Sequence, residues 1–224
     1  PFSFREFLKA RKRSYDPRVL SQVGKIKREL REYLEWGGFP EVVLNPMERE
    51  RLLKEYCELA FFKDFVERHG IRSTTLARYL FEFCLQNASS ELSVRAIEKK
   101  LRATGAKFGI TTLYSYIERL EDTLFIFFLR RFSKKAHLRE AWPKKVYVCD
   151  PGLMKPFRLS PSPGKLMENV VFLELLRKRN ERPLMQLFYF KGNKQMEVDF
   201  LLKEGERVET LVQVTHASSR DEID

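Results

Sequence analysis

The chain of 224 residues is poor in cysteine and has no long uninterrupted apolar run, and each shortage excludes a class of protein. Its three cysteines, Cys57, Cys84 and Cys149, are odd in number and widely spaced, which argues against a disulfide framework and a zinc site. Lys, Arg or Glu repeatedly interrupts the apolar stretches, so no segment is suited to cross a membrane. The first residues contain neither an initiator Met nor the apolar core of a signal peptide. We therefore expect a cytoplasmic protein with no membrane partner.

Acidic residues are fewer than basic ones. The chain contains 42 Lys and Arg and 31 Asp and Glu, which gives a net charge of +11. Such an excess of positive charge is typical of a nucleic-acid-binding protein, because it attracts the phosphate backbone. The alternative is a soluble surface that is basic without such a partner. On charge alone, DNA is the partner that we favour.

Apolar residues in the first part of the chain recur at every third or fourth position. The pattern runs over residues 19–36, 48–66 and 76–85, and it predicts three amphipathic helices. Gly37 and Gly38 follow the first of them, where glycine commonly ends a helix. The first part of the chain is therefore expected to be helical.

The middle of the chain follows the pattern of a winged helix. Ser93 can cap a short helix, Gly105 allows a turn, and a second amphipathic helix follows the turn. Two short helices joined in this way form a helix-turn-helix, and the apolar runs 124–129 and 144–148 then predict a hairpin. In this motif the second helix enters the major groove of DNA. The residues of that helix expected to face the groove are Thr112, Ser115 and Arg119.

The connection between the two predicted strands of the hairpin is unusually basic. From Arg130 to Lys145, seven bases stand against one acid, Glu140. Such a wing suits phosphate contacts, which position a protein on DNA without reading its sequence. A solvated hairpin used for protein contact is the alternative. The bases expected to contact phosphate are Arg130, Arg131, Lys134, Lys135, Lys144 and Lys145.

A segment rich in Pro, Ser and Gly at residues 160–164 indicates a domain boundary. After it, residues 165–178 follow the pattern of a helix. Three strand-like runs come next, at residues 186–190, 196–202 and 208–215. The expected fold class is therefore α+β. A mostly helical winged-helix domain at residues 19–155 precedes an α/β domain at residues 156–224.

Two acidic residues in the second domain are placed unusually. Asp199 lies within an apolar strand, and Glu168 lies near the start of the helix. A carboxylate buried in an apolar strand is unfavourable unless it is paired, hydrogen-bonded or bound to a metal. With Gln213 on the next strand, these residues offer the oxygen ligands that Mg²⁺ prefers, and the metal would activate water for attack on a phosphodiester. The alternative is that Asp199 points to solvent at a sheet edge.

Five segments also carry a family resemblance: PFSFREFL at 1–8, YLEWGGFPEVV at 33–43, VYVCDPGL at 146–153, ENVVFLEL at 168–175 and EVDF at 197–200. In this order they resemble the C-terminal half of prokaryotic, and especially archaeal, AAA-superfamily ATPases. The resemblance covers nearly the whole chain. It implies that residues 1–18 are the tail of an absent ATPase domain, and that residues 156–224 form a truncated restriction-endonuclease-like domain of the PD-(D/E)xK superfamily.

The resemblance also implies site residues. Glu168 and Asp199 match the metal ligands, and with Gln213 they match the catalytic residues of a Mg²⁺-dependent nuclease. Thr215 stands where the family pattern has the Lys that stabilises charge on the phosphate, so nuclease activity is uncertain. The lysines that could replace it are Lys191, Lys194 and Lys203. No G-x-x-x-x-G-K-[ST] run occurs, so this chain has no ATP site of its own.

These observations lead to one favoured function and two alternatives. The favoured function is that of a DNA-binding C-terminal portion of an AAA-family ATPase, with an inactive nuclease-like domain. One alternative is a Mg²⁺-dependent DNA endonuclease, and the other is a protein-interaction module for an ATPase partner. A P-loop ATPase domain, or a second copy of the chain, is the further partner expected.

Overall fold

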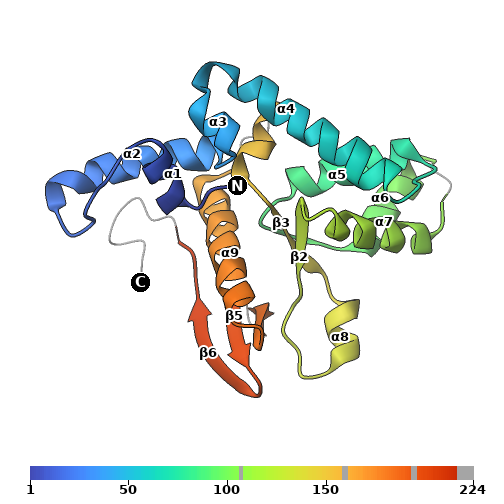
Figure 1. Cartoon of the computed structure of the whole chain (residues 1–224). Coiled ribbons are helices and arrows are strands. Elements are labelled where there is room, and N and C mark those ends of the chain that lie inside the picture. The colour runs from blue at the N-terminus through green and yellow to red at the C-terminus, as the bar shows by residue number, and fades with distance from the viewer. Residues whose placement is uncertain (106–107, 158–160, 193–195, 216–224) are drawn as a thin grey trace.

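The protein is α+β, with two small antiparallel sheets among its helices (Figure 1). The structure is a computed structural model, and it describes residues 1–105, 108–157, 161–192 and 196–215. In Figure 1, α9 runs down the middle of the molecule between α2 and the strands β2 and β3. The expected fold class is therefore confirmed.

The first part of the chain is helical, as its apolar spacing predicts. Its elements are α1 (Phe4–Ala10), α2 (Leu20–Trp36), α3 (Pro40–Leu44), η1 (Pro46–Glu48), α4 (Arg49–Leu59), the π-helix η2 (Ala60–Glu67) and α5 (Thr74–Gln86). Ser3 and Glu6 form a capping box at the start of α1. Gly37 ends α2 with a φ of 77°, which is favourable only for glycine among the common residues.

The helix-turn-helix and the hairpin also form. Their elements are β1 (Ser90–Leu92), α6 (Val94–Ala103), α7 (Ile110–Asp122), β2 (Ile126–Leu129), α8 (Ala136–Ala141) and β3 (Lys144–Val148). The side chain of Ser93 caps α6 by accepting a hydrogen bond from the backbone of Ala96. The strands form an antiparallel sheet in the order β1–β3–β2. The sequence pattern predicts neither β1 nor α8, which lies within the basic wing.

The last part of the chain packs one long helix against a second sheet. It consists of η3 (Pro151–Phe157), α9 (Pro163–Glu181), β4 (Met185–Lys191), β5 (Glu197–Glu204) and β6 (Arg207–Val212). The side chain of Ser162 caps α9, and Pro163 occupies its first turn. The strands form an antiparallel sheet in the order β4–β5–β6. The helix and the three strands predicted here are confirmed, with different ends.

The strand β3 separates two apolar cores. Val146 and Val148 point into the core of the helices and the winged helix, whereas Tyr147 points into a core with α9 and the second sheet. The ring of Tyr147 stacks on that of Phe172 with their centroids 4.1 Å apart. Side chains alternate along a strand, so Lys145 faces the same side as Tyr147. The domain boundary expected near residue 155 stays a prediction, because Tyr147 shares its core with residues beyond it.

Candidate functional site

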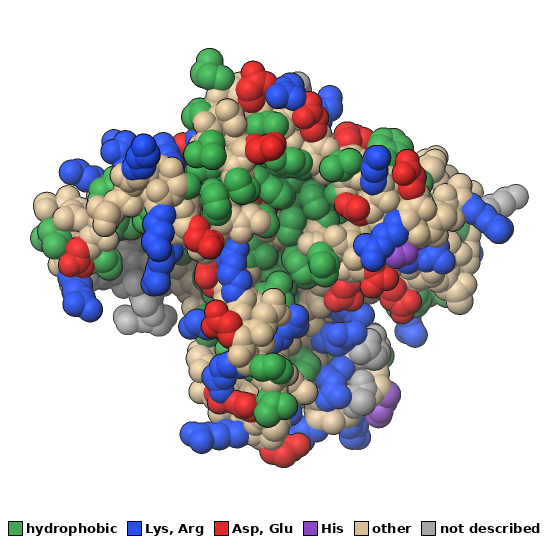
Figure 2. Space-filling view, viewed as in Figure 1, with side chains coloured by type: hydrophobic (Ala, Val, Ile, Leu, Met, Phe, Trp, Pro, Cys, Tyr) green, Lys and Arg blue, Asp and Glu red, His purple; other side chains and the backbone are tan. Residues whose placement is uncertain are grey.

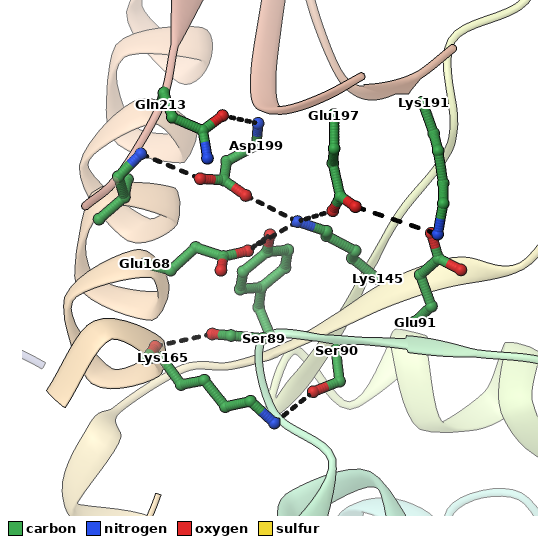
Figure 3. Close-up of polar contacts among 12 residues, drawn as sticks. Ser89, Ser90, Glu91, Lys145, Lys165, Glu168, Lys191, Glu197, Asp199 and Gln213 are labelled. Atoms are coloured by element: carbon green, nitrogen blue, oxygen red, sulfur yellow. Dashed lines mark hydrogen bonds and ion pairs between the residues drawn. The ribbon is translucent and has the colours of Figure 1, made fainter. Parts of the chain in front are cut away.

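Three carboxylates meet one amine between β3, α9 and β5 (Figure 3). Nζ of Lys145 lies 2.8 Å from Oδ1 of Asp199, 3.0 Å from Oε1 of Glu197 and 3.2 Å from Oε1 of Glu168. The side chain of Lys145 is 5% exposed and that of Asp199 is 7% exposed. We call these four residues the carboxylate cluster. The amine thus lies where a bound cation would contact all three acids.

Backbone groups hold Asp199 in this position. Its Oδ2 accepts a hydrogen bond of 2.9 Å from the backbone N–H of Val214, and its own N–H donates to Oε1 of Gln213 at 3.3 Å. Glu168, Asp199 and Gln213 are therefore brought together, as the sequence predicts. The alternative of an Asp199 side chain that points to solvent is wrong, because Asp199 packs under α9 and β3.

Burial and charge set the protonation of the cluster. Burial alone would lower the pKa of Lys145, but Asp199, Glu168 and Glu197 together raise it above its ordinary value. Burial raises the pKa of Glu168, and it raises the pKa of Tyr147 well above its ordinary range. The hydroxyl of Tyr147 donates a hydrogen bond of 2.7 Å to Oε1 of Glu168. The cluster therefore holds a charged ammonium beside a neutral phenol.

The lysine that contacts the carboxylates is Lys145, which the sequence analysis places in the wing. Of the lysines considered as replacements, Lys191 lies at the edge of the cluster, 2.7 Å from Glu91 and 3.9 Å from Glu197. Lys203 lies over the ring of Phe132 instead. Lys194 lies outside the described residues. The missed residue is thus on a strand of the winged helix, far from Thr215 in sequence.

The expectation that Lys145 belongs to the exposed basic wing is wrong, because this residue is buried and paired with three acids. Other wing bases are also engaged. The guanidinium of Arg131 stacks on the ring of Trp142 at 4.1 Å and donates to the carbonyl of Lys191. Arg139 donates to the carbonyl of Ser133 at 2.7 Å.

Exposed bases nevertheless remain on the wing. Arg130 and Lys144 are half-buried, whereas Lys134 and Lys135 are exposed. In Figure 2, Lys and Arg side chains gather around the part of the molecule where Figure 1 shows α8. Of the six wing bases expected to contact phosphate, Lys134 and Lys135 are therefore the exposed ones.

The three residues expected to face DNA from α7 share one surface hollow. Thr112, Ser115 and Arg119 line a shallow depression of about 680 Å³, and the neighbouring segment contributes His69, Gly70, Arg72 and Ser73. Nη1 of Arg119 donates to the carbonyl of His69 at 3.2 Å, which fixes α7 against this segment. The exposed side chain of Arg72 adds a second guanidinium. We call this depression the α7 hollow.

The described part of the chain contains no preformed metal site. Within it, no group of three or more His, Cys, Asp or Glu side chains is arranged to hold a metal. Mg²⁺ would bind Glu168 and Asp199 only if the amine of Lys145 moved away, because Nζ of Lys145 already contacts one oxygen of each carboxylate. Magnesium binding stays a prediction. No described helix has the length and apolar character of a membrane span.

Two domain families match the chain in sequence. Residues 27–160 match DUF8612, a domain of unknown function. Residues 163–222 match DUF4143, also a domain of unknown function and one often found in the C-terminal regions of AAA ATPases. The two matches together cover most of the chain.

Similar proteins occur in an archaeon and a bacterium. The "Uncharacterized protein MJ1544" of Methanocaldococcus jannaschii is 34% identical over 219 residues, which are 96% of this chain and 48% of that protein. An "Uncharacterized protein" of Haemophilus influenzae is 23% identical over 212 residues, 93% of this chain and 50% of that protein. The chain therefore spans about half the length of these relatives. No solved structure matches it.

Proposed function

The chain belongs to the DUF8612 domain family, and we propose that it binds DNA through its winged-helix elements. One observation carries this proposal. The helix-turn-helix and hairpin form in the order that the motif requires, and the residues expected to face DNA from α7 gather with Arg72 in one hollow. Hydroxyl and guanidinium groups are donors that commonly contact DNA phosphates. The α7 hollow therefore has the chemistry of a phosphate-binding surface.

The wing would add contacts on the other side of α7. Tyr114 and Glu118 of α7 face the residues at the end of the wing, including Trp142. The exposed Lys134 and Lys135 lie on the same wing. A helix flanked by a basic wing and a guanidinium-bearing hollow would present positive charge on both sides of a bound groove.

We further propose that the chain acts as the C-terminal portion of an AAA-family ATPase. The DUF4143 match and the family resemblance support this parentage, and the relatives are about twice as long as the chain. ATP binding would then belong to a P-loop domain outside this sequence. The chain itself would supply the DNA contact.

Salt-dependent binding to duplex DNA tests the main proposal. Replacing both Lys134 and Lys135 by Ala should weaken binding and lower the slope of log affinity against log salt by about 2, because each phosphate contact contributes about 0.9 to that slope. Arg72→Ala should lower the slope by about 1. The matched control replaces Lys25 and Lys27 of α2, which are also exposed, and should leave the slope unchanged. Equal effects of wing and control variants would contradict the proposed surface.

A second candidate, a Mg²⁺-dependent DNA nuclease, is favoured by the carboxylate cluster. Glu168, Asp199 and Gln213 converge, and Lys145 places a positive charge there that could stabilise the charge developing on a phosphate. The same amine competes with Mg²⁺ for the carboxylates. The metal, when bound, would supply an activated water.

Incubation of DNA with Mg²⁺ or Mn²⁺, followed by a denaturing gel, tests this candidate. Cleavage by the wild-type chain that disappears in Asp199→Asn would support a nuclease. Loss of cleavage in Lys191→Met would indicate that the positive charge at the edge of the cluster contributes to cleavage. Intact DNA under every condition would eliminate the nuclease and leave DNA binding as the proposed function.

A further inference from the structure

The structure contains an aromatic pocket between the helix-turn-helix and the end of the wing. Its volume is about 300 Å³, and we call it the wing pocket. Three aromatic side chains line it, each from a different element: Tyr114 from α7, Phe128 from β2, and Trp142 next to β3. A pocket of this size suits a small chemical group rather than a whole helix or strand.

Packing fixes the aromatic wall of the wing pocket. The guanidinium of Arg131 lies 4.1 Å from the centre of the Trp142 ring. Phe128 is buried within the sheet, where it pairs with Val146. Tyr114, by contrast, is 40% exposed. The pocket thus has a rigid inner wall and an open side.

Charged groups at the pocket are positioned for a polar ligand. Arg95 and Glu118 both line it and are exposed. Among the residues that the structure describes, neither makes an ion pair or a hydrogen bond. An apolar peptide side chain would leave both groups in water, whereas a ligand with polar edges and an anionic tail would pair with both. The rest of the wing adds the positive charge of Lys134 and Lys135.

We propose that the wing pocket binds an unpaired nucleobase of a DNA strand, with the adjoining phosphates toward Arg95. The aromatic rings would stack on the base, and the carboxylate of Glu118 would accept a hydrogen bond from an exocyclic amino group, as carboxylates do with cytosine. This inference rests on the proposed DNA binding and adds a ligand to it. Through this pocket the chain would recognise single-stranded or distorted DNA, in which bases are unpaired.

Tryptophan fluorescence provides a direct test, because the chain has only two tryptophans. Trp36 lies on α2, away from the wing pocket, and Trp36→Phe leaves Trp142 as the sole tryptophan without altering the pocket. A short single-stranded oligo(dC) should quench the emission of Trp142 on binding. An abasic oligonucleotide of the same length, which has the phosphates but no bases, should bind by charge without quenching.

Two pocket variants sharpen the test. Trp142→Ala should lower the affinity for oligo(dC) about tenfold, within the range of one lost base stack, and lower the affinity for duplex DNA by much less. Glu118→Gln should reduce the preference for oligo(dC) over oligo(dT), and circular dichroism would confirm that both variants fold.

Each outcome of the experiment has one meaning. Quenching by oligo(dC) alone supports the base-binding pocket. Equal quenching by the abasic strand, or binding of oligo(dC) with unchanged Trp142 emission, overturns it while leaving DNA binding intact. Failure of every oligonucleotide and duplex to bind overturns the proposed function as well. Quenching by an aromatic peptide but not by oligo(dC) would assign the pocket to a protein partner.

Discussion

Replacing Lys145 by Met tests whether its amine holds the carboxylate cluster together. The substitution keeps most of the side-chain volume and removes the ammonium that contacts all three acids. The side chains of Asp199 and Glu168 are 7% and 12% exposed, so both would become buried charges without this partner. Breaking a buried pair from one side lowers the free energy of unfolding by about 3–5 kcal/mol. Glu197 is 37% exposed and should add little.

Urea denaturation measures this loss as a lower midpoint at an unchanged m-value. The matched control is Lys191→Met, which removes a pair at a side chain that is 40% exposed and should lower the free energy by less than about 1 kcal/mol. Adding Glu168→Gln and Asp199→Asn to Lys145→Met should recover most of the stability, because the buried charges are then gone. The deficit of Lys145→Met should also shrink as the pH falls, because burial raises the pKa of Glu168 and this carboxylate then takes up a proton. Loss of less than about 1 kcal/mol in Lys145→Met would refute this reasoning.

Three further predictions concern other buried groups. Burial raises the pKa of Asp150 from its ordinary 3.8 to about 7, so the folded state binds the extra proton between these values. The free energy of unfolding of the wild type, relative to that of Asp150→Asn, should therefore fall by about 1.4 kcal/mol per pH unit between about pH 4 and about pH 7. If the free energies of both proteins changed with pH in parallel, this prediction would be contradicted. Gly37→Ala should lower the free energy of unfolding by at least about 2 kcal/mol, since φ is +77° and the new Cβ would lie 1.6 Å from Oδ1 of Asp150; an unchanged urea midpoint would contradict it. Burial raises the thiol pKa of Cys57 and of Cys84 to about 12, so neither should react with a thiol reagent near pH 8 until the chain unfolds, and fast reaction of the native chain would contradict the structure.

The sequence predicts the helices better than the short elements. The apolar spacing identifies α2 because seventeen residues carry several turns of the pattern. It misses β1, which is three residues long and begins with Ser90 and Glu91. It also misses α8, because the bases on either side of that helix favour a solvated loop. Pairing with β3 gives β1 its structure, and such pairing is not encoded in local spacing.

The candidate site shows the same division between local pattern and tertiary contact. An acid inside an apolar strand singles out Asp199, but alternation alone leaves open whether it faces solvent or the core. The packing of α9 and β3 decides this. The charge count groups Lys145 with the basic residues of the wing. Its alternation with Val146 and Val148 carried the missing signal, because it places Lys145 on the face of Tyr147.

The affinity of the purified chain for duplex DNA across a salt series tests the central claim most directly. The proposal predicts binding that weakens steeply between about 50 and 200 mM salt, with a smaller slope after removal of Lys134 and Lys135. Absence of binding at the lower salt concentration, or binding with no dependence on salt, would contradict a winged helix that holds DNA through its phosphates.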